Sequence, residues 1–518
     1  MVPRQDGGLL GSFEEAIALQ RVVSRRDLTT AIALGQSFLG TSAVWLAGTK
    51  EQRSRTAEVL LSGRLAALAL TEEEHGSDVL ATSTTATREA GGWRLDGRKW
   101  LINNATRGSL LTLFAKSAPE GGLHGCSLFL LDKDAVDPAS LAPLPKIRTH
   151  GIRGADISGL LLRGALLPAG ALLGAEGGGA ELLLQCLQLT RTACAAFSLG
   201  AADTALRLAL DFACTRRLYG GTVLELPHAR RTLTNAFLDL LLCDAVATAG
   251  ARAIEGAPEQ LSLWSSIIKY FVPVTCERVI REVAVVLGAR HYLRDHASGA
   301  FQKLLRDAAV VSLFDGSTAV NLDGVATQLP RLAPSRAAAP AEREATLERI
   351  FSLSAALPPF EPARLALMNA GRDDVTQGVP EAVAALRAGA GTATPTTRAV
   401  LLPLAELLQR RLDELRAEVA TLAGRKRSPE LFAAAERFCG LFAGASALHL
   451  WLRSPAALDP FFAEGDWLAA CLERLLPSGP VRGSETHLSA AADRMLQLHS
   501  GERAFAHTAS ALGRGAGE

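Results

Sequence analysis

The chain has 518 residues, 48% of them hydrophobic, so it can bury several hydrophobic cores. Its 54 Lys and Arg residues are balanced by 53 Asp and Glu residues, which gives a formal net charge of +1. This balance excludes a whole-protein electrostatic attraction to nucleic acid or anionic lipid, and we expect no nucleic-acid partner. We therefore expect a large globular protein of two to four domains, in which local sites carry recognition.

Three features of the sequence indicate a cytoplasmic protein. The opening residues, MVPRQDGGLLGSFEEA, lack the basic-then-apolar layout of a signal peptide. The 8 cysteines occur singly and without a CxxC pair, which favours buried reduced thiols, and we expect no metal site. The uncharged run 438–452 has about 15 residues, whereas a bilayer requires roughly 18 to 20. A buried helix is the expected structure of that run.

The first third of the chain divides into helices and then strands. Ser12 and Glu15 form a capping-box pattern before an apolar series, so residues 1–64 are predicted to be a helical N-terminal domain. From Leu65 the pattern changes to short runs such as LAALAL, KWLIN and CSLFLL, separated by Gly, Asp, Asn and Pro. Such runs are typical of strands, and residues 65–173 are predicted to form a small antiparallel β-barrel.

The remainder of the chain is predicted to be helical. Residues 174–332 carry one very long apolar-striped segment and about three further helical segments, which indicates a bundle. A stretch rich in Pro, Ala and Arg then links to an additional helical domain, so that residues 333–518 comprise linker and domain. The predicted fold class is α+β, mostly α.

Four segments in fixed order resemble the acyl-CoA dehydrogenase family. They are LALTEEEHGSD (68–78), LDGRKWLINNA (95–105), LTRTACAAFSLGAADTALRLALDFACTRRLYG (189–220) and LLRDAAVVSLFDGST (304–318). The resemblance covers residues 8 to 330 or so, and it implies an oxidoreductase with FAD as cofactor and a helix, barrel, helix architecture. The additional C-terminal domain resembles that of long-chain members, where it assists dimerisation and membrane-surface contact.

The first two segments supply cofactor-facing residues by resemblance. Thr71 stands where the family places a threonine beside the flavin ring, and Ser77 stands near substrate and cofactor phosphate. In the second segment the family's aromatic and threonine positions are Leu101 and Asn103, so Leu101 is expected to line the flavin and Asn103 to offer it a hydrogen bond. Fixed donors there stabilise the negative charge of a reduced flavin.

The third segment places two arginines about seven helical turns apart. The resemblance puts Thr190 and Arg191 at the acyl site and Arg216 at the FAD pyrophosphate of a neighbouring subunit, which implies a homodimer or homotetramer. A planar, permanently charged guanidinium suits phosphate. A surface salt bridge is the alternative for either arginine.

Two family features differ in this sequence. The glycine-rich loop that packs against the cofactor after a Q-x-x-G-G-x-G pattern keeps only Gly288, and Pro227 replaces the glutamine that follows the RRLYG stretch. The opening helical domain is also short by a helix or two. We therefore expect a weakened FAD site that retains Gly288.

The candidate base is Asp315, within the sequence FDGST. The family norm at this place is Tyr-Glu-Gly-Thr, so the carboxylate is one methylene shorter, and the neighbouring matches are Gly316 at the substrate and Ser317 and Thr318 at the cofactor. Some members carry the base on the residue before the acyl-site arginine, which here is Thr190 and has no carboxylate. The alternative is that Asp315 only caps the turn before a helix.

These observations lead to one hypothesis and two alternatives. The first is FAD-dependent α,β-dehydrogenation of an acyl thioester, on CoA or on an acyl-carrier protein, with an electron acceptor such as an electron-transfer flavoprotein. The second is a flavin-dependent monooxygenase or oxidase of the same fold. The third is a non-catalytic scaffold that has lost FAD binding.

Overall fold

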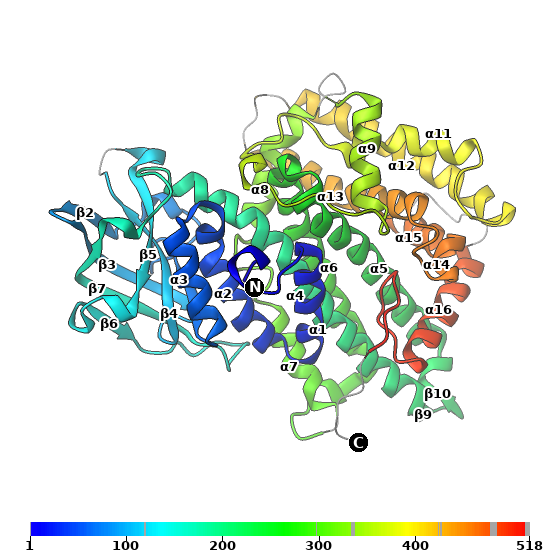
Figure 1. Ribbon diagram of the computed structural model, residues 1–518. Coiled ribbons are helices and arrows are strands. Elements are labelled where there is room, and N and C mark those ends of the chain that lie inside the picture. The colour runs from blue at the N-terminus through cyan, green and yellow to red at the C-terminus, as the bar shows by residue number, and fades with distance from the viewer. Residues whose placement is uncertain are drawn as a thin grey trace. The chain divides into compact units, whose positions relative to one another are not determined.

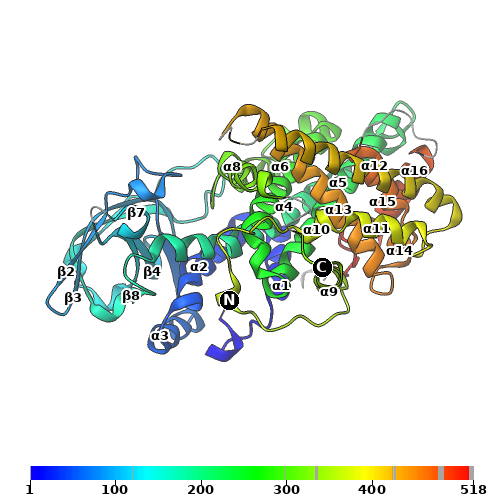
Figure 2. The same cartoon turned by 90° about the horizontal axis from the view of Figure 1, so that it is seen from above.

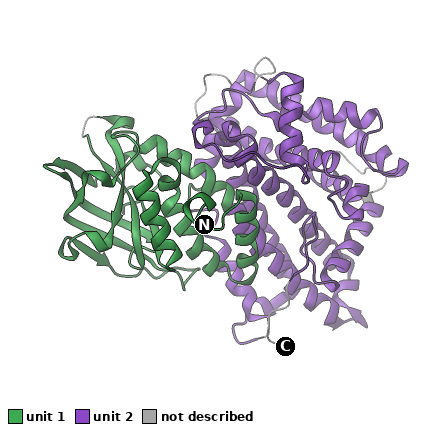
Figure 3. Ribbon diagram, in the orientation of Figure 1, with its two compact units in different colours: residues 1–193, 315–317 green, residues 194–314, 318–518 purple. Residues whose placement is uncertain are grey.

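The structure is a computed structural model that describes residues 2–118, 121–296, 298–332, 337–422, 424, 427–476 and 484–512. The chain divides into two units, coloured separately in Figure 3. Unit 1 comprises Met1–Ala193 with Asp315–Ser317, and unit 2 comprises Cys194–Phe314 with Thr318–Glu518. The helices predicted beyond residue 333 therefore share a unit with the bundle.

Unit 1 opens with three helices, which confirms the predicted helical beginning. They are α1 (Phe13–Arg26), α2 (Leu28–Ala47) and α3 (Lys50–Leu61). The Ser12 hydroxyl accepts a hydrogen bond from the Glu15 amide at 3.1 Å, as the capping pattern predicts, and Asp27 caps α2 in the same way. Such caps satisfy amides that have no partner within the first helical turn.

The strands of unit 1 form one eight-stranded sheet in the order β6-β7-β3-β2-β4-β5-β8, with β1 paired to β4 (Figure 1). Their bounds are β1 Leu65–Ala69, β2 Thr85–Glu89, β3 Gly92–Asn103, β4 Gly108–Lys116, β5 Cys126–Asp132, β6 Leu141–Leu144, β7 Ile157–Pro168 and β8 Leu172–Leu173. Most pairs are antiparallel, as predicted, but β1 runs parallel to β4. Alternating apolar residues predict a strand without predicting its direction, so the sequence could not show this pairing.

Helix α2 packs against the sheet at close range. A Cβ atom on Gly40 would lie 2.5 Å from the backbone of Ala67 in β1, so only glycine permits this approach. Leu39 and Val44 of α2 share a buried cluster with Leu110 and Phe114 of β4. A second cluster, centred on residues such as Trp93 and Phe129, fills the other side of the sheet.

The long helical segment is a single helix, α4 (Gly179–Thr215), of 37 residues. Its first turns contribute Ala180, Leu183 and Cys186 to the cluster that also contains α2. This packing explains why the division between the units falls inside α4, after Ala193, whereas the sequence suggested a boundary at residue 173. The other helices predicted for the bundle are α5 (Pro227–Gly256), α6 (Leu261–Leu287), α7 (Gly299–Ala308) and α8 (Thr318–Gln328).

The last third of the chain adds eight helices within the described residues. They are α9 (Pro340–Phe351), α10 (Asp374–Gln377), α11 (Val379–Arg387), α12 (Pro395–Thr421), α13 (Pro429–Arg453), α14 (Pro460–Glu464), α15 (Asp466–Leu475) and α16 (Ser484–Ser500). Figures 1 and 2 show α12, α13 and α15 side by side. Several of these helices pack against α5, and part of the predicted linker, residues 333–336, lies outside the described residues.

Three of the described helices, α2, α4 and α13, are long and apolar enough to cross a membrane by length and composition alone. The protein itself buries 61%, 83% and 72% of their most apolar stretches, respectively. The run 438–452 is part of α13 and is mostly buried, as expected. Seven cysteines are buried and free, whereas Cys214 is exposed.

Candidate active site

Asp315 lies in the turn between α7 and α8, in the left-handed region of backbone conformation. Its φ is 53°, and that of Gly316 is 92°. Such a φ is uncommon outside glycine, although aspartate tolerates it better than most residues. The Thr318 amide donates to the Ser312 carbonyl at 3.1 Å, which closes the chain on both sides of Asp315. The turn therefore fixes the direction in which the carboxylate leaves the backbone.

Arg191 on α4 holds Asp315 through the backbone. The guanidinium Nε donates a hydrogen bond to the Asp315 carbonyl oxygen at 3.0 Å. Thr190, the neighbouring residue, is buried, and its hydroxyl lies 3.5 Å from the Leu187 carbonyl oxygen. The structure thus joins Arg191 to the candidate base, which the sequence placed at the same site by resemblance alone.

The turn is also anchored within unit 2. Lys269 on α6 is fully buried, and its ammonium donates to the Val311 carbonyl at 2.6 Å. The same ammonium lies 5.4 Å from the ring centroid of Phe314, the residue before Asp315. Phe314 also meets Phe197 of α4 edge to face, with 6.2 Å between ring centroids. These contacts fix the chain that leads into the candidate base.

The cofactor-facing residues predicted in the sheet lie on two neighbouring segments. The Thr71 hydroxyl donates to the Trp100 carbonyl at 2.8 Å, and the Trp100 amide donates to the Thr71 carbonyl at 3.0 Å. Leu101 has a φ of 61° at an irregularity in the pairing of β3 with β7, and it is 46% exposed. The bulge turns Leu101 away from the hydrogen-bonded pairing of β3 with β7, so that the leucine side chain presents an apolar surface.

Asn103 and Ser77 have different surroundings. Asn103 ends β3, and its side-chain oxygen is buried with no hydrogen-bond partner among the described residues. A buried unsatisfied oxygen is costly, and a bound molecule that supplies an N–H or O–H would satisfy it. Ser77 lies in the exposed loop between β1 and β2.

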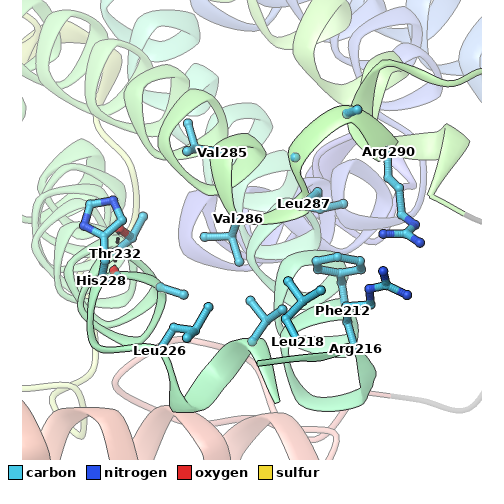
Figure 4. Close-up of a pocket in the computed structure, with 14 residues that line it drawn as sticks. Phe212, Arg216, Leu218, Leu226, His228, Thr232, Val285, Val286, Leu287 and Arg290 are labelled. Carbon is cyan, nitrogen blue, oxygen red and sulfur yellow. Dashed lines mark hydrogen bonds between the residues drawn. The ribbon is translucent and has the colours of Figure 1, made fainter. Parts of the chain in front are cut away.

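A pocket in unit 2 gathers two more of the predicted cofactor residues, Arg216 and Gly288, whereas Ser317 and Thr318 are not among its lining residues (Figure 4). Its volume is about 380 Å³, and residues at the end of α4, the start of α5 and the end of α6 line it. Gly288 caps α6 with a φ of 58°, and a Cβ atom there would meet no other atom within 4 Å. The glycine position is therefore open, as a cofactor-packing position requires.

The same pocket contains three residues that the sequence reasoning missed, Phe212, His228 and Arg290. The Arg290 guanidinium lies 5.3 Å from the Phe212 ring centroid, a cation–π distance. In Figure 4 the guanidinium groups of Arg216 and Arg290 lie at one end of the pocket beside Phe212, and His228 lies at the other. Two guanidinium groups beside an aromatic ring form a site suited to phosphate. The signal was Arg290 itself, within the segment that departs from the glycine-rich pattern.

A buried ion pair next to Thr71 in the sequence, between Glu72 and Lys99, was also missed. Lys99 is fully buried in β3, and its ammonium lies 2.9 Å from a carboxylate oxygen of Glu72. Burial lowers the pKa of Lys99 to about 8, although Glu72 acts in the opposite direction. Burial also opposes ionisation of Glu72, but hydrogen bonds from neighbouring hydroxyls and from Lys99 outweigh it and hold the Glu72 pKa well below its usual range.

Metal chemistry has no candidate site among the residues that the structure describes. Within the described ranges, no three His, Cys, Asp or Glu side chains gather closely enough to hold a metal ion.

Comparison with known proteins gives a consistent result. Residues 67–164 match the model of the acyl-CoA dehydrogenase middle domain, and residues 177–329 match that of the acyl-CoA dehydrogenase C-terminal domain. An acyl-CoA dehydrogenase of Bacillus subtilis is 28% identical over 329 residues, which cover 62% of this chain and 83% of the relative.

Two solved structures have the same fold. An acyl-CoA dehydrogenase from Bacillus anthracis, complexed with FAD, is 18% identical and has a TM-score of 0.68, with 96% of this chain and 87% of that chain covered. A prolyl acyl carrier protein oxidase is 22% identical and has a TM-score of 0.59, with 63% and 85% covered. The first shows that the fold extends through the C-terminal helices.

The relatives that this chain matches are named acyl-CoA dehydrogenases, which are oxidoreductases, and this chain is an enzyme of that class. Residues 67–164 and 177–329 thus match acyl-CoA dehydrogenase domains, and the relatives and structural neighbours of the chain are acyl-CoA dehydrogenases, a family that depends on FAD.

Proposed function

We propose that this protein catalyses the FAD-dependent α,β-dehydrogenation of an acyl thioester, carried on CoA or on an acyl-carrier protein. The observation that carries the proposal is the carboxylate of Asp315 on a left-handed turn whose carbonyl oxygen Arg191 holds at 3.0 Å. Thr190 offers no carboxylate at the alternative position on α4, so Asp315 is the residue that would act as base.

Two features of the described residues fit FAD. The pocket of Arg216, Arg290 and the open Gly288 suits a pyrophosphate, which carries negative charge and needs room beside the backbone. The unsatisfied oxygen of Asn103 lies on a segment that is joined to Thr71 through Trp100 and suits the N–H of a flavin ring. Leu101, Ser77, Ser317 and Thr318 are the further residues proposed to line the cofactor.

The chain's own residues would perform the proton transfer. Asp315 would remove the α proton of the thioester, and Arg191 would keep the Asp315 backbone fixed while the carboxylate reaches the substrate. Ser77, Thr190 and Gly316 are proposed to line the substrate. When bound, FAD would supply the acceptor for the β hydride, so that a C=C bond forms as the two C–H bonds break.

The proposal includes the electron acceptor, the oligomeric state and the cellular location of the protein. We propose an electron-transfer flavoprotein as the acceptor, because the proposed reaction leaves two electrons to be removed. A homodimer or homotetramer would place the exposed pocket of Arg216 beside a neighbouring subunit's cofactor, as the family resemblance implies. A cytoplasmic location is also proposed, because the cysteines occur singly and the described ones are free.

A panel of acyl-CoA and acyl-carrier thioesters, added without oxygen to the purified protein, tests the proposal. Loss of the oxidised flavin absorbance on addition of a saturated thioester supports dehydrogenation. A flavin that stays oxidised with every thioester contradicts it. Rapid reoxidation of the reduced flavin in air would favour the oxidase alternative, and a colourless protein that takes up no FAD would favour the scaffold.

A further inference from the structure

The ion pair of Glu72 and Lys99 joins residues that are next to those proposed to face the flavin, because Glu72 follows Thr71 and Lys99 precedes Trp100 and Leu101. Lys99 is completely buried and Glu72 is 5% exposed, and the two charged groups are 2.9 Å apart. Removing two such charges from water is costly unless their remaining hydrogen-bonding capacity is satisfied. The surroundings of each partner show how it is satisfied.

The Glu72 carboxylate collects donors from the start of the next strand. The Ser83 amide and hydroxyl donate at 2.7 and 2.6 Å, and the Thr84 amide and hydroxyl donate at 3.0 and 2.6 Å. The Thr82 hydroxyl donates to the same carboxylate. Glu72 therefore joins the end of β1 to the start of β2 and closes the base of the loop that carries Ser77.

The Lys99 ammonium connects β3 to the end of β1 and to the start of β2. Besides Glu72, it donates to the Leu70 carbonyl at 2.9 Å and to the Thr82 hydroxyl at 3.0 Å. Its three protons thus have three acceptors, two of which are on residues that flank Thr71. The next residue, Trp100, exchanges two hydrogen bonds with Thr71.

These contacts converge on one small region. The end of β1, the start of β2 and the bulged part of β3 all meet at the ion pair, and the proposed cofactor residues Thr71, Ser77 and Leu101 lie within a few residues of it. A network in which every polar atom is satisfied rigidifies its surroundings. Movement of the pair would therefore move the rim, by which we mean the part of the sheet edge that carries Thr71, Ser77 and Leu101.

We infer that Glu72 and Lys99 are positioning residues which together hold the flavin-facing rim of the sheet in the shape that binds the cofactor. The inference rests on the proposed function, because the rim faces a flavin only if FAD is the cofactor. The pair touches neither substrate nor cofactor in this role. It acts through Leu70, Thr71 and the loop that it closes.

The chain offers a matched control one residue away on each segment. Glu73 and Arg98 form an ion pair at 2.8 Å between the same two segments, but both side chains are about half exposed. An exposed pair contributes little to stability and orders little backbone. Removing it changes the charge in the same way as removing Glu72 or Lys99, without disturbing the buried network.

The test compares Glu72→Gln and Lys99→Met with Glu73→Gln and Arg98→Met in the full-length protein. Three quantities are measured for each variant: the dissociation constant for FAD, the absorbance spectrum and midpoint potential of the bound flavin, and amide hydrogen exchange of residues 70–84 without FAD. We expect Glu72→Gln and Lys99→Met to weaken FAD binding at least tenfold, to shift the bound-flavin spectrum and potential, and to speed exchange at Ser83 and Thr84. The control variants should stay within twofold of wild type.

The outcomes separate this inference from the proposed function. Equal FAD affinity, spectrum and potential in Glu72→Gln, Lys99→Met and wild type would overturn the positioning role while leaving the proposed function intact. Faster exchange without any change at the flavin would also overturn it, because the pair would then only stabilise the fold. A wild-type protein that binds no FAD would refute the proposed function, and the inference with it, before any variant is compared.

Discussion

The Nε atom of Arg191 donates a hydrogen bond to the carbonyl oxygen of Asp315 at 3.0 Å. The bond is accepted by the backbone oxygen of Asp315 rather than by its carboxylate. An arginine on the rigid helix α4 therefore fixes the left-handed turn on which the candidate base stands. Loss of this hydrogen bond should therefore lower the rate of the reaction more than it lowers the stability of the fold.

Arg191→Ala should slow flavin reduction by thioester by roughly 10- to 100-fold, because a displacement of about 1 Å at a reacting group has an effect of that size. FAD affinity should change less than twofold. Stopped-flow reduction without oxygen, together with an FAD titration, measures both. Arg163, an exposed arginine on β7, provides the control as Arg163→Ala. A rate equal to wild type in Arg191→Ala would refute the positioning of Asp315 by this contact.

Arg216→Ala and Arg290→Ala should each weaken FAD binding by roughly tenfold or more, since a hydrogen bond to a charged group contributes about 1.5–3 kcal/mol. The reason is that both guanidinium groups line the pocket that is proposed to hold the pyrophosphate. Fluorescence titration with FAD measures the effect. Riboflavin, which lacks the phosphates, should bind both variants as it binds wild type, and a comparable loss for riboflavin would count against this assignment.

How much of this site the sequence could predict depends on the kind of contact. The segments around Thr71, Asn103, Arg191 and Asp315 were found because each carries a recognisable local pattern. The pair of Glu72 and Lys99 was missed because Glu72 stands in a run of three acidic residues, which looks like a solvated turn. Its partner is 27 residues away, and only the pairing of strands brings them together.

The direction of strand pairing and the positions of positive φ could not be predicted from the sequence either. The parallel pairing of β1 with β4 leaves the alternation of apolar residues unchanged. Asp315 has its positive φ where Arg191, 124 residues away, binds its carbonyl oxygen, and Leu101 has its positive φ at an irregularity in the pairing of β3 with β7. Phe212 and Arg290 meet only because α4 and the chain after α6 end at the same pocket.

The stability contributed by Glu72 should depend on pH. Its folded-state pKa lies well below the ordinary value of 4.5, so its contribution is fully present above pH 4.5 and is lost as the pH falls towards the folded-state pKa. Glu72→Gln should therefore lower the free energy of unfolding by about 3 kcal/mol at pH 7, and by progressively less below pH 4.5. Urea unfolding of both proteins across this range measures the difference. A difference that grows as the pH falls would contradict the prediction.

Asp239 on α5 should be important for attaching the C-terminal helices. Its buried carboxylate accepts hydrogen bonds from Arg474 of α15 at 2.9 and 2.8 Å and forms an ion pair with Arg278 of α6 at 3.2 Å. Asp239→Ala should lower the free energy of unfolding by about 3 kcal/mol, because the Arg474 guanidinium loses the buried carboxylate that accepts both of its hydrogen bonds. Asp413→Ala, which removes an exposed partner of Arg416, should change it by about 0.5 kcal/mol or less. Equal effects of the two substitutions in chemical unfolding would contradict this role.

The central claim is that the Asp315 carboxylate removes the substrate proton. The most direct measurement is the rate of flavin reduction by a thioester substrate, without oxygen, in wild type, Asp315→Asn and Asp315→Glu. Asparagine keeps the size of the side chain and tolerates a positive φ, so it should bind substrate and FAD while reduction slows by at least about 100-fold. Glutamate restores the missing methylene and should retain most of the wild-type rate or exceed it. If Asp315→Asn reduces its flavin as fast as wild type, Asp315 is not the base.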